Sequence, residues 1–158
     1  LLGVGSLIGL KNWEKWLKTV AIVKLSAPEV QAELIGEGPL LAQLEQKALH
    51  LGLSGTVRLR GSLPRPEVLT RMRHSRVLLH TSDYESFGFV LPEAAMNGCS
   101  LVSTPVGIGP EMAECAETPE QLAALVLKAL QLPPAIQARV PYSIEKAADG
   151  YQRLFRFF

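Results

Sequence analysis

Cysteines are scarce in this chain, and long apolar runs are absent. Its 158 residues include only two cysteines, Cys99 and Cys115. Their spacing fits neither the close pairs of a zinc site nor a disulfide-stapled secreted domain, so we expect reduced thiols and a cytoplasmic setting. No apolar run is long enough to span a bilayer, and no segment has the pattern of a secretory signal. We therefore expect neither secretion nor membrane insertion of this chain.

An excess of charge of one sign is also lacking. Sixteen Lys and Arg residues against 15 Asp and Glu residues give a formal net charge of +1. This balance provides no broad attraction for nucleic acid, so no nucleic-acid partner is expected. No Asp-x-Asp and no cluster of metal ligands occurs, so we expect no metal and no other cofactor. With 47% hydrophobic residues, the chain is expected to form one domain over 1–158.

Strand-like and helix-like segments alternate along the chain. This alternation predicts an α/β fold with a Rossmann-like, doubly wound parallel sheet. Asn12 is expected to cap the first helix, Pro39 to lie in the first turn of the second, and Gly52 to end it. The strands are expected at 1–6, 30–36, 57–60, 76–81 and 101–104, and the helices at 12–25, 40–51, 66–74, 88–97 and 119–130, with a C-terminal helix within 143–158.

The most informative segment is TSDYESFGFVLPEAA, residues 81–95. Glu85 is expected in the loop after a strand, and Glu93 inside the helix that follows. Ser86 is expected to cap that helix through its hydroxyl, and the backbone N–H groups of residues 87–90 are expected to be its unpaired donors, where anions bind. Two acceptors for sugar hydroxyls beside a phosphate cradle indicate a nucleotide-sugar site.

Together with GCSLVSTPVG at 98–107, this segment resembles the Glu-x7-Glu signature of retaining group 1 glycosyltransferases, the glycogen-synthase-like and mannosyltransferase-like superfamily. The resemblance runs from Val4 to about Leu132 and implies one half of a two-domain B-type (GT-B) glycosyltransferase fold. In that family the amino-terminal half carries the acceptor site, and we expect this chain to be a piece of a longer protein that lacks it. The isolated chain is expected to bind a nucleotide sugar but to transfer little. The resemblance leaves membrane association of the parent protein open, at the cytoplasmic face and through that half.

The resemblance also implies roles for individual residues. Glu93 matches the carboxylate that accepts the ribose hydroxyls, and Glu85 matches the one that faces the donor sugar. Lys11 matches a cation that neutralises the departing diphosphate, whereas Ser6 stands where the family has Arg and Asn12 where it has Gly. The candidate catalytic residues are Glu85 and Lys11, and the donor-binding candidates are Gly5, Ser6, Gly61, Leu63, Glu85, Ser86, Phe87, Gly88, Phe89, Val90 and Glu93.

Ordinary structural roles compete with these assignments. Glu93 could instead be a carboxylate that the helix dipole favours near the start of a helix, and Lys11 could be an exposed lysine at a helix start. His80 is predicted to be structural, and Trp13 and Trp16 are predicted to pack the first helix. The turn 36–39 is predicted to be structural, and the glycines of the loop 105–111 are expected to permit close approach of a ligand.

Two other functions are weighed from the residues. Gly3, Gly5 and Gly9 after the first strand imitate a dinucleotide-binding loop of an NAD(P)-dependent oxidoreductase, although no acid ends the second strand at the usual distance. A non-catalytic nucleotide-binding or interaction module with a decayed site is the other alternative. Its support is Ser6 in place of Arg and the region after Glu111, which is expected to be shortened relative to the family. The intact motif around Glu85 and Glu93 favours the glycosyltransferase donor domain over both.

Overall fold

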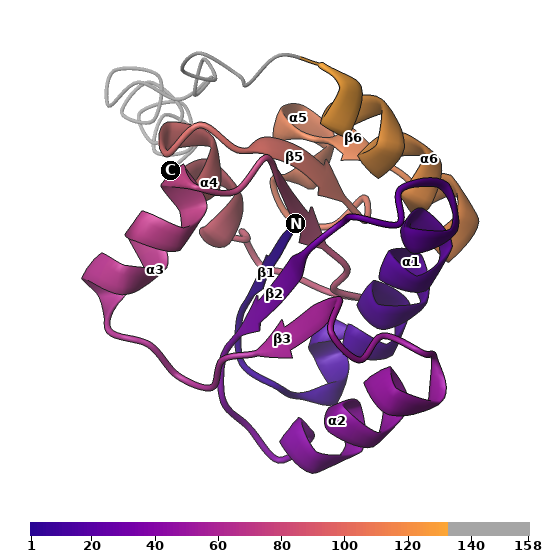
Figure 1. Ribbon diagram of the computed structural model, residues 1–158. Coiled ribbons are helices and arrows are strands. Elements are labelled where there is room, and N and C mark those ends of the chain that lie inside the picture. Colours follow the sequence, from indigo (N-terminus) through magenta and orange to yellow (C-terminus); the bar gives the residue numbers. More distant parts are fainter. Residues whose placement is uncertain (133–158) are drawn as a thin grey trace, which may run out of the picture.

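The computed structural model describes residues 1–132, and the helix predicted within 143–158 lies outside them. Six parallel strands form one sheet in the order β3-β2-β1-β4-β5-β6 (Figure 1). This order confirms the predicted doubly wound α/β architecture. The strands are β1 (Leu2–Val4), β2 (Ala32–Ile35), β3 (Val57–Leu59), β4 (Val77–His80), β5 (Ser100–Ser103) and β6 (Glu114–Cys115).

Helices cover both faces of the sheet (Figure 1). On one face α1, α2 and α6 enclose a core around Trp16, and on the other α3, α4 and α5 enclose a second core around Met72 and Leu91. Strand β4 contributes to both cores, with Leu79 facing the first and Leu78 the second, which is why it is continuously apolar. The helices are η1 (Gly9–Lys11), α1 (Trp13–Ser26), α2 (Leu41–His50), α3 (Arg65–Arg73), α4 (Val90–Met96), α5 (Gly109–Met112) and α6 (Pro119–Gln131).

The strand order places a topological switch point between β1 and β4. From β1 the chain winds outward to β2 and β3, then crosses back to β4 on the other side of β1. Because all the strands are parallel, the loops that follow them leave at one edge of the sheet, and ligands of such folds bind there. The stretches 6–11, 36–38, 61–63, 83–90 and 105–111, which contain most of the candidate site residues, follow β1 to β5 at this edge.

Several predicted helix ends are confirmed. Asn12 caps α1, since its side chain accepts a hydrogen bond from the Lys15 N–H at 3.1 Å. Gly52 follows α2 with a φ of +67°, which suits a glycine after a helix. Trp13 and Trp16 are buried, as predicted for packing of the first helix. These features depend on residues close in sequence, which explains why the pattern of residues predicts them.

The start of α4 and the turn before α2 differ from the prediction. Helix α4 begins at Val90 rather than at residue 88, and its cap residue, Phe89, makes no side-chain capping bond. Ser86 therefore does not cap the helix, because Gly88 has a φ of +90° and interrupts helical geometry between them. In the first turn of α4 the Leu91 N–H donates to the Gly88 carbonyl at 3.0 Å and Pro92 has no N–H, so neither residue offers a free donor. Pro39 lies in the turn before α2, which starts at Leu41.

Three short elements were not predicted: η1, α5 and β6. Each has between two and four residues, which is too short to show a helical or strand-like repeat of apolar positions. Strand β6 pairs with β5 and extends the sheet by one strand beyond the predicted five. The region 113–117, which was expected to be shortened relative to the family, therefore contains a strand.

The turn 36–39 leads into α2 and packs against the loop after β1. A Cβ atom at Gly36, whose φ is +153°, would lie 1.8 Å from the carbonyl oxygen of Gly5. The loop after β2 can therefore lie directly against the loop after β1, where the Leu7 N–H donates to the carbonyl of Glu37 at 2.8 Å. This contact sets the shape of one side of the edge at which ligands would bind.

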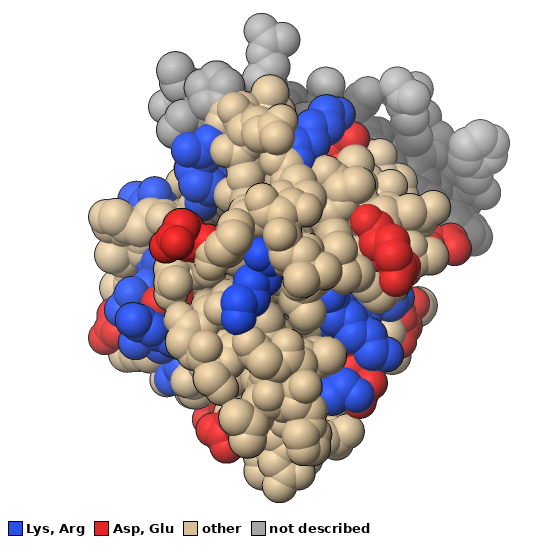
Figure 2. Space-filling view, turned by 45° about the vertical axis from the view of Figure 1, so that its right-hand side comes forward, with Lys and Arg blue, Asp and Glu red and all other residues tan. Residues whose placement is uncertain are grey.

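Charged side chains of both signs are mixed on the face of the molecule that Figure 2 shows. In Figure 2, Lys and Arg are separated by Asp, Glu and uncharged residues, and no continuous patch of one sign covers the face shown. Over the described range 1–132, none of the helices combines the length and the apolar character that a membrane crossing needs.

Candidate functional site

Lys11 and Glu85 meet at the switch point. Lys11 ends η1 in the loop after β1, and Glu85 lies in the loop after β4. The Nζ atom of Lys11 forms an ion pair and a hydrogen bond with Oε1 of Glu85. The two residues are distant in sequence, and they become neighbours because β1 and β4 lie side by side in the sheet. The structure thus brings together the two candidate catalytic residues.

Two further side chains donate to the same oxygen of Glu85. Nε2 of His80 lies 3.0 Å from Oε1, and the Ser82 hydroxyl donates to it at 2.9 Å. Partial burial by itself would raise the pKa of Glu85, but the hydrogen bonds from Lys11, His80 and Ser82 outweigh burial and lower this pKa. Glu85 is therefore an ionised hydrogen-bond acceptor at neutral pH.

His80 is buried beneath Glu85 at the end of β4. Its Nδ1 atom lies 3.0 Å from the Ser103 hydroxyl on the neighbouring strand β5. Burial lowers the pKa of His80, and the nearby Glu85 carboxylate offsets this effect only in part, so the ring is neutral at neutral pH. The sequence predicts a structural role for His80, and its contact with Glu85 was missed. The available signal was a polar residue that ends an otherwise apolar strand directly before the motif.

A second polar cluster joins the loops after β1 and β4. The Asn12 amide donates to Asp83 at 2.9 and 3.1 Å, and Nζ of Lys15 lies 3.2 Å from Oδ1 of Asp83. The Asp83 N–H also donates to the carbonyl of Leu10 at 2.9 Å. Asn12 has a φ of +46°, a left-handed conformation that Asn adopts more readily than other residues with side chains. This conformation explains how Asn can stand where the family has Gly.

Glu93 lies in the first turn of α4, apart from this cluster. Oε1 of Glu93 pairs with Nη2 of Arg65, the first residue of α3, at 2.7 Å. The Glu93 side chain is 31% exposed and the Arg65 side chain 71% exposed, so solvent reaches both groups. Within residues 1–132, the structure shows no contact between Glu93 and the Lys11–Glu85 pair. Arg65 was not predicted as a site residue, because no local pattern links it to Glu93.

A cavity of about 240 Å³ opens at the carboxyl ends of β1 and β2. It brings together three of the predicted donor-binding residues, Gly5, Ser6 and Leu63. Gly61 does not line this cavity, but its carbonyl accepts a hydrogen bond from the Gly36 N–H at 2.9 Å and so supports the wall. The lining residues are Val4, Gly5, Ser6, Ile35, Gly36, Glu37, Ser62, Leu63 and Val68.

The loop between the two glutamates packs against the loop after β5. The Phe87 carbonyl accepts a hydrogen bond from the Ile108 N–H at 2.7 Å, and a Cβ atom at Gly107 would lie 2.3 Å from that carbonyl oxygen. The close approach that Gly107 permits is therefore to this loop of the protein itself. The Phe87 and Phe89 rings lie 4.6 Å apart between centroids, and Phe89 is 72% exposed.

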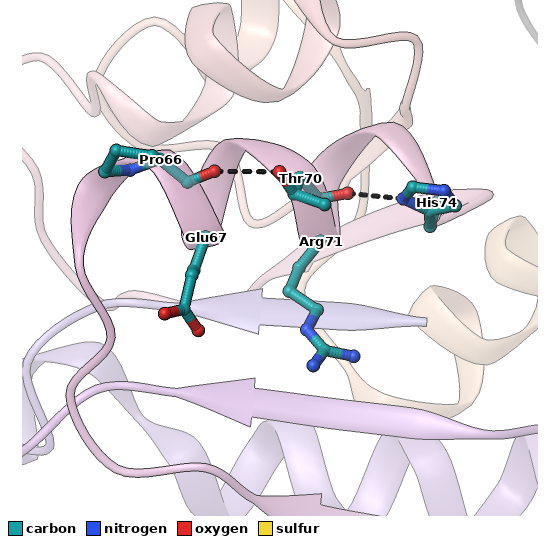
Figure 3. A pocket seen from close by; sticks show the side chains of 5 residues that line it. All are labelled: Pro66, Glu67, Thr70, Arg71 and His74. Atoms are coloured by element: carbon teal, nitrogen blue, oxygen red, sulfur yellow. Dashed lines mark hydrogen bonds between the residues drawn. The ribbon is translucent and has the colours of Figure 1, made fainter.

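A larger hollow of about 490 Å³ lies along α3, away from the predicted residues. Figure 3 shows Glu67 and Arg71 pointing from α3 toward the sheet. In this hollow Thr70 donates to the Pro66 carbonyl at 2.9 Å, and Nη1 of Arg71 lies 3.5 Å from Oε1 of Glu33. The lining of the hollow includes none of the predicted site residues, so we do not regard it as the functional site. Among residues 1–132, no group of three or more His, Cys, Asp and Glu is placed to hold a metal ion.

Similar sequences occur in parts of longer proteins. It is 38% identical over 85 residues to the phosphatidylinositol N-acetylglucosaminyltransferase gpi3 subunit of Schizosaccharomyces pombe, covering 54% of this chain and 19% of that protein. It is 30% identical over 107 residues to the uncharacterized glycosyltransferase YqgM of Bacillus subtilis, covering 68% of this chain and 30% of that protein. The chain thus spans less than a third of the length of either relative.

Solved structures share the fold. The pneumococcal O-GlcNAc transferase GtfA in complex with UDP and GlcNAc matches with a TM-score of 0.74 and 19% identity, over 82% of this chain and 28% of that one. Anabaena HepE in complex with UDP-glucose matches with a TM-score of 0.73 and 23% identity, over 82% of this chain and 38% of that one. The family model described as glycosyl transferases group 1 matches residues 1–145. Because this family model matches most of the chain, and the sheet has the strand order described above, the chain belongs to the group 1 glycosyltransferases.

Proposed function

We propose that this chain is the donor-binding half of a glycosyltransferase and binds a nucleotide-diphosphate sugar across the switch point between β1 and β4. The observation that carries the proposal is the meeting of Lys11 and Glu85 at this point. A cation and an ionised carboxylate lie side by side where the fold binds ligands, which suits a donor that has both an anionic diphosphate and a hydroxyl-rich sugar.

Lys11 and Glu85 would divide the work at the reacting end of the donor. Lys11 would stabilise the negative charge that develops on the diphosphate as it leaves, a role worth several kcal/mol in comparable sites. Glu85 already accepts three hydrogen bonds on one oxygen, which disperses its charge and disfavours attack on a sugar carbon. We therefore assign Glu85 to binding of sugar hydroxyls, and we propose transfer with retention through a front-face route that needs no covalent enzyme intermediate.

Glu93 and the cavity beside β1 would hold the nucleoside. Arg65 occupies only Oε1 of Glu93, and a carboxylate has further acceptor positions for the two ribose hydroxyls. The 240 Å³ cavity lies below the roughly 300–1,000 Å³ usual for drug-sized ligands and suits a base alone. The motif loop residues Ser86, Phe87, Gly88, Phe89 and Val90 remain proposed contacts of the donor.

The names of relatives favour one donor for the first test. One relative is an N-acetylglucosaminyltransferase subunit, and two solved structures with this fold contain UDP or UDP-glucose. We therefore propose a UDP sugar, with UDP-N-acetylglucosamine first. The acceptor would bind an amino-terminal half outside this sequence, and that half would also account for any attachment to the cytoplasmic face of a membrane. Transfer without a metal is likewise part of the proposal.

Calorimetric titration of the chain with UDP, GDP and ADP tests the proposal. We expect UDP to bind and Glu93→Ala to weaken binding by about tenfold or more, because hydrogen bonds to a charged acceptor are lost. Glu120→Ala is the matched control, since Glu120 is an exposed carboxylate in the first turn of a different helix, α6. Equal binding by wild type and Glu93→Ala would contradict the ribose assignment. A folded chain that binds none of the three nucleotides would instead favour the non-catalytic module.

A further inference from the structure

His80 is held on two sides within the sheet. Its ring lies at the end of β4 and is 4% exposed, with Glu85 and Ser82 near Nε2 and Ser103 of β5 near Nδ1. An ionised carboxylate can only accept hydrogen bonds, so the nitrogen that faces Glu85 must carry the proton. The Ser103 hydroxyl has a single hydrogen, which can be donated to Nδ1 at 3.0 Å or to the Thr104 carbonyl at 2.8 Å, so Nδ1 of the neutral ring has an available donor. The contact of Nε2 with Glu85 selects the Nε2-protonated tautomer of the neutral ring.

The donors around Glu85 leave one of its oxygens unoccupied. Lys11, His80 and Ser82 all donate to Oε1. Over residues 1–132, Oε2 has no hydrogen-bond partner, and Trp16 Nε1 is the one buried side-chain nitrogen or oxygen there without a partner. Oε2 is consequently open to solvent. A carboxylate fixed through one oxygen presents the other in a constant direction to a ligand.

The three donors differ in how firmly they are held. Lys11 reaches Glu85 through a flexible chain of four methylenes, and a bound diphosphate would compete for its ammonium group. The Ser82 hydroxyl lies within reach of both Glu85 and Nε2 of His80, so rotation about its C–O bond can turn its one hydrogen away from Glu85. The His80 ring has no such freedom, because it is buried and bonded at both nitrogens.

We propose that His80 is a positioning residue that holds Oε1 of Glu85 and thereby presents Oε2 to the donor sugar. This inference deepens the proposed function and rests on it for the identity of the ligand. His80 itself touches neither the sugar nor the phosphate in this scheme. It acts through Glu85, and its removal should affect recognition of the sugar more than recognition of the nucleotide.

Two substitutions separate this role from a general structural one. The amide nitrogen of His80→Gln can take the place of Nε2 and still donate to Glu85, whereas the shorter side chain of His80→Asn corresponds to Nδ1 and does not reach it. Both variants keep a polar side chain able to bond Ser103. Circular dichroism first establishes that both are folded.

The ligand-free arm of the experiment is nuclear magnetic resonance. In wild type we expect the Nε2-protonated tautomer of His80, with Nδ1 unprotonated. We expect the pKa of Glu85 to rise by about one unit in His80→Asn and to stay near the wild-type value in His80→Gln. The opposite tautomer, or a Glu85 pKa unchanged by His80→Asn, would overturn the inference.

The ligand arm compares UDP-N-acetylglucosamine with UDP. We expect His80→Asn to weaken binding of the nucleotide sugar about tenfold and of UDP less than about twofold, with His80→Gln close to wild type for both. Equal losses for the two ligands would point to a structural role and contradict the inference. If wild type bound neither ligand, the proposed function would fail, and the titration of Glu85 would alone decide whether His80 orients it.

Discussion

At the scale of single residues, the site depends on one carboxylate with three donors on the same oxygen. Lys11, His80 and Ser82 all bond Oε1 of Glu85, and these bonds lower the pKa of Glu85 despite its partial burial. Burial lowers the pKa of His80. The lowered pKa values of Glu85 and His80 are therefore both properties of the folded state, and both groups link folding to pH.

Acid should destabilise the protein in two ranges of pH. In an unfolded chain the pKa values would be near 6.5 for His80 and 4.5 for Glu85, and folding lowers both. The unfolded chain therefore takes up each proton at a higher pH than the folded chain, so acid favours unfolding. The stability contributed by His80 is present above pH 6.5 and is lost as the pH falls through its lowered pKa. The stability contributed by Glu85 is present above pH 4.5 and is lost as the pH falls through the lowered pKa of Glu85.

Urea unfolding at about pH 7.5, about pH 5.5 and about pH 4 measures these losses. His80→Gln should reduce the decrease in unfolding free energy between the first two values, and Glu85→Gln the decrease between the last two. Lys11 and Glu85 are the charged groups that affect His80, so the comparison is made at constant ionic strength. If the unfolding free energy of a variant fell as much as that of wild type over the pH range assigned to the substituted residue, the linkage for that residue would be refuted.

At the scale of elements, glycines decide how closely neighbouring loops approach. Gly36 lets the loop after β2 touch the loop after β1, and Gly107 lets the loop after β5 touch the loop that contains Phe87. Gly88 interrupts the chain before α4 and so sets where that helix starts. The loops at the carboxyl edge are thus shaped by contacts among themselves, before any ligand is bound.

Gly36→Ala should destabilise the fold by about 2–4 kcal/mol. The new methyl group would meet the Gly5 carbonyl oxygen at 1.8 Å, and the φ of +153° disfavours any residue with a side chain. Gly9→Ala is the matched control, because nothing lies within 4 Å of a Cβ atom there, and we expect a change within about 0.5 kcal/mol. Thermal and urea unfolding measure both variants. Equal stability of the two would show that the loops separate at little cost.

At the scale of the whole molecule, both faces of the sheet are covered and the two thiols lie in different surroundings. Cys99 is fully buried in the core on the α4 face, whereas Cys115 at the end of β6 is partly exposed, and both are free. Burial raises the pKa of Cys99 to about 11 and also raises that of Cys115. The thiols therefore report on different events, since only one of them requires the core to open.

Thiol labelling should show two separate phases. We expect Cys115 to react first and Cys99 to react only as fast as the whole domain unfolds, with no change in the thermal midpoint when reductant is added. Cys115→Ser isolates the slow phase, and its rate should increase with urea in parallel with global unfolding. Rapid labelling of Cys99 in the native protein would mean that the α4 face opens locally.

Much of the fold follows from local patterns. Strand β4, the Asn12 cap and Gly52 after α2 depend on neighbours within a few residues, and the structure has each of them where it was predicted. The motif around Glu85 and Glu93 also lies on the predicted strand–loop–helix unit, although Ser86 does not cap its helix. Elements of two to four residues, such as β6, left no periodic signal.

The contacts of the site follow from the order of the strands. Lys11 reaches Glu85 because β1 lies beside β4, and His80 bonds Ser103 because β4 lies beside β5. Arg65 meets Glu93 because α3 and α4 pack on the same face. The sequence alone determines the residue types and their places at strand ends, since hydrophobic periodicity and capping are local. It does not determine the partner of each charged group. That partner depends on which distant segments become neighbours when the sheet and its helices pack, and this is settled only in the folded protein.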